Sequence, residues 1–389
     1  MQRRIHKLAS LCEITSSKRI FYSEYTSSGI PFYRSKEIID LFNHNDIATE
    51  LFISEERYNE IKSKFGVPVE NDMLLTSVGT IGIPYLVKAK DKFYFKDGNL
   101  TWFRKYNQDL IVPSYLYLWI SSNVGKQTLA LLSMGAAQPA LTISRLKKLC
   151  INLPPVGTQQ KIASILSTYD TLIEYNTKRI RLLEQMAENL YKEWFVRFRF
   201  PGHENAEMEN GLPKGWKKGS LKEICEFKRG KNITSDEMSE GNVPVISAGI
   251  TPSGYHNKAN VKGVSVTMSS SGANAGYISF HYSDIWAADC SFVDSQSTKY
   301  IYFVYEMLNN MRAIINNFQR GAAQPHVYPK DINRIRLIIP EDSLIAKANE
   351  RLKILHDEIK NFQEQNQRIT RQRDLLLPRL MSGKLEVKP

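Results

Sequence analysis

The chain of 389 residues is long enough for two or three domains, and its hydrophobic content of 42% is ordinary for a globular protein. No apolar run approaches the length of a membrane-spanning helix, and the basic N-terminus is not followed by the apolar stretch of a signal peptide. We therefore expect a cytoplasmic protein without a membrane span. The four cysteines stand singly, which argues against a disulfide framework and against a zinc or other metal site. The 52 Lys and Arg residues exceed the 40 Asp and Glu residues, and the net charge of +12 favours a polyanionic partner, although a basic protein without such a partner fits equally well.

Residues 1–155 predict a first domain that mixes strands and helices. A strand is expected at Ile30–Tyr33, a charged helical insert at Leu51–Phe65 and a helix at Tyr115–Leu132. This helix leads into the motif Gly-Ala-Ala-Gln-Pro, which ends at Pro139. A β-like run, Leu146–Leu153, then closes the domain.

An apolar run in the middle of this domain, Met73–Ser77, enters a turn of small residues, Gly79–Gly82. Such a loop can bring backbone N–H groups close to a phosphate, and it can equally be a plain hairpin turn. Ser77 is therefore a candidate phosphate contact, with the plain turn as its alternative.

The next region, residues 156–199, predicts one long helix. Its apolar residues recur in steps of four and three, which is the seam of a coiled coil. One seam residue is an asparagine, which in a coiled coil costs stability but fixes register and partner. The principal seam positions are Ile162, Leu166, Ile173, Asn176, Ile180, Leu183 and Leu190.

After a polar linker that starts near residue 200, the chain repeats itself. The Gly-Ala-Ala-Gln-Pro motif returns and ends at Pro325, and Leu8 and Cys12 correspond to Leu221 and Cys225. The two copies of the motif are closer together along the chain than the two copies of Leu8 and Cys12, so the first domain carries an insertion before its motif. A helix matching Tyr115–Leu132 is expected at Ile301–Phe318. The seam returns in the same register as Leu352, Leu355, Ile359, Asn366, Ile369 and Leu376.

Two long helices in matching register, separated by a domain-sized insert, are best explained as partners that pack on each other. The alternative for either helix alone is an ordinary core helix. The second copy also carries a local basic excess that includes Lys228, Arg229 and Lys231, and a Ser/Gly loop that includes Ser271 and Asn274. These residues indicate either a phosphate-contacting face or a solvated surface.

The joint pattern resembles the specificity subunit of a type I restriction–modification system. The features that carry the resemblance are the two half-repeats, the two Gly-Ala-Ala-Gln-Pro loops, Leu153-Pro154-Pro155 followed by Gln159-Gln160-Lys161-Ile162, the opening Leu212-Pro213-Lys214-Gly215-Trp216 and the ending Leu375 to Leu385. They cover essentially the whole chain. One departure is that the first domain lacks the Leu-Pro-Lys-Gly-Trp opening.

The resemblance implies an α/β fold with two tandem α+β target recognition domains joined by two long antiparallel coiled-coil helices. The implied division is a first recognition domain at 1–155, a first long helix at 156–199, a linker and second recognition domain at 200–342, and a second long helix with a tail at 343–389. Each domain would read one half of an asymmetric, bipartite site on double-stranded DNA. The helices would contact two modification (methyltransferase) subunits, which restriction (motor and nuclease) subunits join.

No catalytic motif is present. A phosphate-binding GxxxxGK[ST] loop, an HExxH motif and a glycine-rich cofactor loop are all missing from the sequence. We therefore expect S-adenosylmethionine, ATP and Mg²⁺ to bind to partner subunits and no cofactor to bind to this chain. A free-standing DNA methyltransferase or nuclease, and a coiled-coil scaffold without DNA contact, are the alternatives. The candidate DNA-binding residues are Ser77, Gln138, Arg145, Lys228, Arg229, Lys231, Ser271, Asn274, Arg320 and Gln324.

Overall fold

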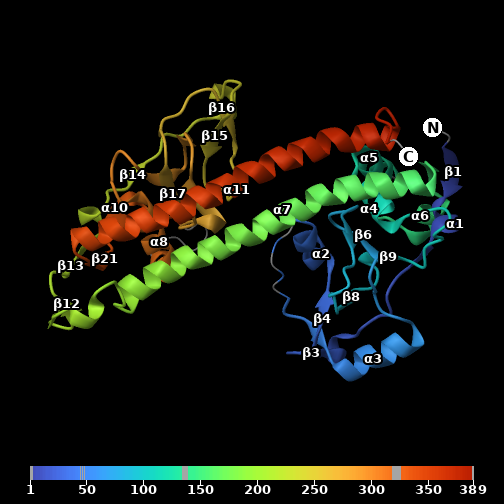
Figure 1. The fold of residues 1–389 in the computed structure, drawn as a ribbon, viewed down its shortest axis with the longest axis horizontal. Helices are drawn as coiled ribbons and strands as arrows, with labels where there is room; N and C mark the ends of the chain where they lie inside the picture. The colour runs from blue at the N-terminus through green and yellow to red at the C-terminus, as the bar shows by residue number, and fades with distance from the viewer. Residues whose placement is uncertain are drawn as a thin grey trace. The chain divides into compact units, whose positions relative to one another are not determined.

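The computed structural model describes residues 3–43, 45, 47, 49–133, 139–317 and 326–387. These residues form two compact units. Unit 1 comprises Met1–Thr177 with Gln365–Pro389, and unit 2 comprises Lys178–Glu364. Each unit contains one α+β domain and a part of each of two long helices, α7 (Val156–Tyr191) and α11 (Asp342–Ser382) (Figure 1). The expected fold class is confirmed, whereas the finer limits at residues 155, 199 and 342 stay predictions. No helix in the described ranges is long and apolar enough to cross a membrane.

The domain of unit 1 is built on a four-stranded antiparallel sheet in the order β2-β9-β6-β7. A second sheet has the order β3-β5-β4-β8, with β4 and β8 parallel, and β1 pairs with β10. The strands are β1 (Arg4–Lys7), β2 (Glu13–Thr15), β3 (Tyr25–Thr26), β4 (Ile30–Tyr33), β5 (Phe52–Ile53), β6 (Met73–Thr76), β7 (Pro84–Leu86), β8 (Tyr94–Phe95), β9 (Leu100–Arg104) and β10 (Cys150–Leu153). The helices are α1 (Leu8–Leu11), α2 (Ser35–Phe42), α3 (Glu55–Lys64), α4 (Pro113–Ser121), α5 (Asn123–Ser133) and α6 (Ile143–Lys148).

The domain of unit 2 repeats this topology. Its four-stranded sheet has the order β14-β20-β17-β18, a second sheet has the order β16-β15-β19, and β13 pairs with β21. The strands are β11 (Met208–Glu209), β12 (Leu212–Pro213), β13 (Lys217–Ser220), β14 (Lys228–Arg229), β15 (Val243–Ile246), β16 (Gly254–His256), β17 (Ser265–Ser269), β18 (Ile278–His281), β19 (Trp286–Ala287), β20 (Cys290–Asp294) and β21 (Arg336–Ile339). The helices are α8 (Ile301–Asn310), α9 (Arg312–Asn316) and α10 (Pro329–Asn333).

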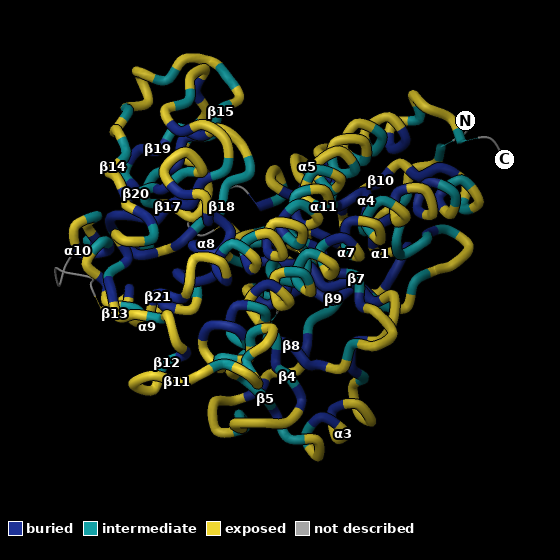
Figure 2. The backbone as a smooth tube through the Cα atoms, turned by 60° about the vertical axis from the view of Figure 1, so that its left-hand side comes forward, coloured by how far each residue is buried: buried dark blue, intermediate teal, exposed yellow. Residues whose placement is uncertain are grey.

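The two copies differ in the region where the spacing between equivalent residues changes. Unit 1 has α2 and α3 between β4 and β6, whereas unit 2 has only the short strand β16 between β15 and β17. The expected insert at Leu51–Phe65 is therefore largely the helix α3. The linker of unit 2 forms the small hairpin β11–β12, whose tip is exposed in Figure 2.

The inner strands β6 and β17, here called the central strands, are completely buried. All four residues of β6 and all five of β17 are buried, because each strand has a neighbour on both sides and is covered on both faces. Met73 pairs with Phe103 of β9, and Ser265 pairs with Asp294 of β20, both in antiparallel register. The pairing of the central strands thus fixes the positions at which the following loops begin.

Three expected elements differ in the structure. The helix expected at Tyr115–Leu132 is two helices, α4 and α5, because Ser122 leaves the helical conformation and its side chain accepts a hydrogen bond from the N–H of Gly125 at 3.1 Å. Its counterpart is likewise divided at Met311 into α8 and α9. The β-like run Leu146–Leu153 begins as the end of α6, which Thr142 caps, and only its second half is the strand β10.

Within each unit the two long helices run antiparallel and join the core of the domain. In unit 1 the core includes Ile162 and Leu166 of α7 together with Leu380 of α11. Asp170 of α7 accepts a hydrogen bond from Arg373 of α11 at 2.7 Å. In unit 2 the core contains residues from the C-terminal part of α7, from the π-helical turn that follows it (Lys192–Val196) and from the N-terminal part of α11, namely Ala187, Tyr191, Trp194, Leu344, Ala348 and Leu352.

The seam positions are covered along both helices. Six are buried: Ile162, Leu166, Ile173, Asn176, Leu352 and Ile359. Seven are half-buried: Ile180, Leu183, Leu190, Leu355, Asn366, Ile369 and Leu376. Antiparallel pairing brings the two seam asparagines into one polar layer of unit 1. There the Asn176 amide donates to Gln365 Oε1, and the Asn366 amide donates to Thr177 Oγ1, each at 3.4 Å.

One side-chain amide attaches a long helix to each domain. Gln159 of α7 is fully buried; its side chain donates to the carbonyls of Leu110 and Pro154 and accepts from the N–H of Val112, all at 2.9 Å. Asn349 of α11 accepts from the N–H groups of Tyr302 and Phe303, at the start of α8. These bonds satisfy backbone groups that helix ends leave open, and they fix how each helix lies on its domain.

We predict that Gly125→Ala destabilises the chain by about 1–3 kcal/mol, because a Cβ at Gly125 would lie 2.1 Å from the carbonyl oxygen of Trp119. Gly157, in the first turn of α7, is the matched control, since a Cβ there meets nothing within 4 Å. Gly157→Ala should leave stability unchanged or raise it by up to about 1 kcal/mol. Urea unfolding of both variants checks this, and equal stabilities would contradict the close approach of α5 to the end of α4.

Candidate DNA interface

The chain leaves the central strand of each domain at an equivalent place. In unit 1 the backbone oxygen of Ser77 accepts from the N–H of Leu141 at 2.9 Å, and Val78 forms a β-bridge with Ala140. In unit 2 the oxygen of Ser270 accepts from the N–H of Val327 at 3.0 Å. Ala140 and Val327 follow the two Gly-Ala-Ala-Gln-Pro motifs. The segment after each motif therefore pairs with the residues that directly follow the central strand.

Three candidate residues belong to this region by sequence, namely Gln138, Arg320 and Gln324. They lie outside the described residues, and their contact with DNA stays a prediction.

In unit 2 two candidates meet at a residue that the sequence did not single out. The Asp289 carboxylate, next to the start of β20, accepts hydrogen bonds from the Arg229 guanidinium and from the Ser271 hydroxyl. Arg229 lies on β14, which pairs with β20, and Ser271 follows the end of β17. The ends of three neighbouring strands therefore bring a partly exposed guanidinium, a carboxylate and a hydroxyl together. An exposed guanidinium can make a bidentate contact to a base edge or a phosphate.

The other candidates of unit 2 lie around this cluster. Lys228 and Lys231 are exposed, and the backbone oxygen of Lys231 accepts from the Trp286 indole N–H at 2.8 Å. Asn274 is half-buried at the end of a short 3₁₀ turn, and its backbone oxygen accepts from the N–H of Tyr277 at 2.9 Å. The structure thus places two exposed cations and a rigid turn at one end of the four-stranded sheet.

In unit 1 the two described candidates have internal contacts. Ser77 is buried, and its hydroxyl lies 2.6 Å from the hydroxyl of Thr101. This buried position does not favour a contact between Ser77 and DNA. The role of Ser77 in DNA binding stays a prediction. Arg145 is exposed on α6, and its guanidinium donates to the carbonyl of Leu132, near the end of α5, at 2.7 Å. Arg145 therefore lies next to the segment that enters the first motif.

A groove of about 400 Å³ lies beside the strand exit of unit 1. Its walls come from the segment after β2, from the turn before β9 and from the segment after the first motif; they include Ser17, Asp97, Ala140 and Thr142. Within the part of the chain that the structure describes, the buried Ser17 Oγ and Asp97 Oδ1 atoms have no hydrogen-bond partner.

Sequence reasoning missed the aspartates and the segment after β2. The Arg19 guanidinium pairs with Asp97 at 2.9 Å, as Arg229 pairs with Asp289 in unit 2. The spacing that relates Cys12 to Cys225 also places Lys18 opposite Lys231, so the repeat itself carried a signal for Lys18 and its neighbours. The aspartates carried no such signal, because their role depends on strand pairing.

Three of the four cysteines are buried. Burial raises the pKa of the Cys12, Cys225 and Cys290 thiols to about 12, so these thiols stay protonated at neutral pH and are poor nucleophiles and metal ligands. Among the described residues no group of three His, Cys, Asp or Glu side chains is placed to hold a metal ion.

Comparison with known proteins gives a consistent result. The family described as type I restriction modification DNA specificity domain matches residues 4–185 and 213–371, which is one match in each half of the chain. The type I restriction enzyme MjaIX specificity subunit of Methanocaldococcus jannaschii is 28% identical over 398 residues, covering 94% of this chain and 89% of the relative. The HindI specificity subunit of Haemophilus influenzae is 20% identical over 362 residues, covering 72% of this chain and 79% of the relative.

Among solved structures, the crystal structure of a type I restriction–modification system S subunit from M. genitalium aligns with a TM-score of 0.64 and 18% identity, covering 97% of this chain and 96% of that one. At this identity the likeness shows a shared fold. The family match is the stronger finding, because it covers most of the sequence in both copies. The chain belongs to the type I restriction–modification DNA specificity family.

Proposed function

We propose that this chain is the DNA-specificity subunit of a type I restriction–modification enzyme and that each of its domains reads one half of an asymmetric, bipartite DNA site. The observation that carries the proposal is the repetition of one α+β framework with different side chains at the same strand exits. A shared framework keeps the geometry of binding, while different side chains select different bases.

The positive charge near the ends of the central strands supports a DNA partner. Lys228, Arg229 and Lys231 lie at this end of the unit 2 sheet, and in unit 1 Lys18, which matches Lys231 in the repeat, lies with Arg19 on the segment after β2. Cations near the duplex neutralise phosphates and release counterions, which gives affinity, and a guanidinium held by a carboxylate can read a guanine edge. In unit 2 the lysines thus supply positioning, and the Arg229–Asp289 pair supplies readout.

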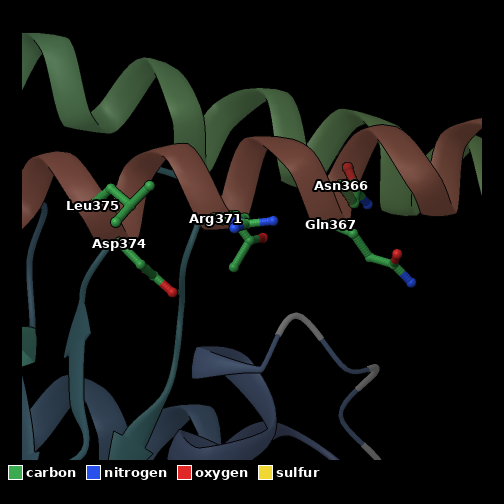
Figure 3. Close-up of a pocket in the computed structure, with 6 residues that line it drawn as sticks. Asn366, Gln367, Arg371, Asp374 and Leu375 are labelled. Atoms are coloured by element: carbon green, nitrogen blue, oxygen red, sulfur yellow. The ribbon is translucent and has the colours of Figure 1, made fainter. Parts of the chain in front are cut away.

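The long helices have surfaces that suit protein partners. On α7, apolar residues at heptad-like spacing remain exposed beside the seam: Ile165, Leu172 and Tyr175 in unit 1, and Leu182 and Met186 in unit 2. An exposed apolar stripe at this spacing is typical of a helix that another helix covers. On the unit 1 part of α11, Gln367 and Asp374 point away from α7, beside the exposed Leu375 (Figure 3).

These surfaces would bind the two modification subunits, which restriction subunits then join. In that assembly this chain is the non-catalytic subunit. S-adenosylmethionine, ATP and Mg²⁺ are used by the partners, in the cytoplasm where the DNA is.

The proposal is tested by mapping methylated bases in a bacterial genome with and without this chain, while the modification subunit is present in both cases. We expect methylation at one bipartite sequence, two short half-sites separated by an unspecified spacer, only when the chain is present. Methylation that is independent of the chain would contradict the proposal. So would methylation by the purified chain alone, which would favour a free-standing methyltransferase.

We further predict that Arg229→Ala weakens specific DNA binding by the assembled modification complex about tenfold and relaxes the methylated sequence within one half-site. The reason is that a bidentate Arg contact to a base gives about 1–3 kcal/mol of discrimination. Binding is measured at fixed salt, and the sequence by methylation mapping. Lys222→Ala is the control, since Lys222 is exposed in the same domain and pairs with Glu226. An unchanged sequence and affinity for Arg229→Ala would show that this residue does not read DNA.

A further inference from the structure

The segment that follows the first edge strand of the main sheet has the same backbone design in both units. In unit 1 it follows β2 and ends in a 3₁₀ turn, Tyr22–Glu24; in unit 2 it follows β14 and ends in a 3₁₀ turn, Ser235–Glu237. The Glu24 carboxylate accepts from the N–H of Phe21 at 2.7 Å, and the Glu237 carboxylate accepts from the N–H of Thr234 at 2.8 Å. All these positions are related by the same spacing that separates Cys12 from Cys225.

This segment of unit 1 is held rigidly to its domain. The N–H of Lys18 donates to the Tyr94 hydroxyl at 2.7 Å, and Ile20 is buried in a small apolar core with Tyr94. Glu24, which caps the turn, also pairs with Arg57 of α3 at 2.7 Å. Because the backbone is fixed at both ends, its outward side chains are presented in a defined position.

The outward side chains form a mixed aromatic and basic surface. The exposed fraction is 61% for Phe21 and 91% for Tyr22, and these two rings are neighbours in sequence. Lys18 and Arg19 are exposed next to them, and the Lys18 ammonium lies 4.6 Å from the centre of the Phe65 ring. The equivalent positions to the two rings in unit 2 are Thr234 and Ser235.

This composition points to duplex DNA as the partner. The two cations match the phosphate backbone, and flat apolar rings can insert between base pairs at a groove. The surface also lies near α3, on the side of the unit 1 domain away from α7 (Figures 1 and 2). It is therefore separate from the helix surface of unit 1 proposed for protein partners.

We propose that Phe21 and Tyr22 form a wedge that inserts at a base step in the half-site read by unit 1, while Lys18 and Arg19 hold the flanking phosphates. The proposal rests on the proposed function, because it requires that unit 1 binds duplex DNA. Insertion unstacks one step and bends the duplex locally, so the sequence at that step is selected by its deformability as well as by base contacts. The half-site of unit 2 is not distorted in this way, since unit 2 has Thr234 and Ser235, and no aromatic ring, at the equivalent positions.

The test uses the assembled modification complex and a duplex that carries the methylation-mapped site, with 2-aminopurine placed at successive positions of both half-sites. The fluorescence of this base rises when it is unstacked. For the wild-type complex we expect a rise at one step of one half-site only. Tyr22→Ala, and more strongly Phe21→Ala with Tyr22→Ala, should abolish the rise and weaken binding roughly tenfold. Tyr22→Phe should keep both, and Ser235→Ala in unit 2 is the matched control without effect.

The outcomes separate the wedge from the proposed function. A wild-type complex that methylates its bipartite site without any local rise in fluorescence overturns the wedge and leaves the proposed function intact. The same holds if the Ala variants keep the rise and the affinity, or if they lose assembly with partner subunits while the chain alone binds DNA as before, which would identify the rings as a protein contact. Absence of any sequence-specific binding by the wild-type complex would instead contradict the proposed function.

Discussion

The structure depends on the burial of the long helices in the cores of the domains. In unit 1, Ile162 and Leu166 of α7 and Leu380 of α11 pack among residues of the domain, and in unit 2 Trp194, Ala348 and Leu352 do the same. A fully buried Leu or Ile side chain contributes about 1.5–3 kcal/mol, so removing a helix would open the core of the domain as well as the helix pair. The helices are therefore structural parts of both domains and not flexible linkers.

Polar contacts fix the register of the long helices, which apolar burial alone does not determine. An apolar seam alone permits a shift along the helix, whereas a buried amide has partners in one register only. Asn176 and Asn366 meet in one layer of unit 1, and Gln159 attaches the first turn of α7 to its domain. In unit 2, the buried His356 of α11 lies 3.2 Å from Glu306 of α8 and 2.9 Å from the hydroxyl of Tyr282. Such networks define how each helix lies on its domain.

Much of the fold could be predicted because the chain repeats. The seam from Ile162 to Leu190 and its second copy follow from periodicity alone, and the regular spacing between equivalent residues predicts two domains of one fold. The prediction of one continuous helix at Tyr115–Leu132 was wrong, because the helix is broken at Ser122. The break depends on a local cap and on a close approach at Gly125. Neither is visible in an apolar run that suits a helix throughout.

The candidate interface could be predicted only in part. Lys228, Arg229 and Lys231 were chosen as candidates from local charge, which can be counted from the sequence alone, and their contact with DNA stays a prediction. Asp289 was not found, because its partners Arg229 and Ser271 are brought to it by strand pairing across distant parts of the sequence. Ser77 was chosen from its loop, yet its hydroxyl is used inside the domain by Thr101. A serine before a glycine turn has the same sequence signature whether it faces the core or a ligand.

The central claim is that two domains of one fold read separate halves of one DNA site from a shared pair of helices. The most direct measurement is to replace residues 200–340 with the corresponding region of another family member and to map the bases that the assembled complex methylates. The account predicts that one half-site changes to that of the donor, while the other half-site and the spacer stay the same. A folded, active hybrid whose two half-sites both change, or whose site does not change, would contradict it.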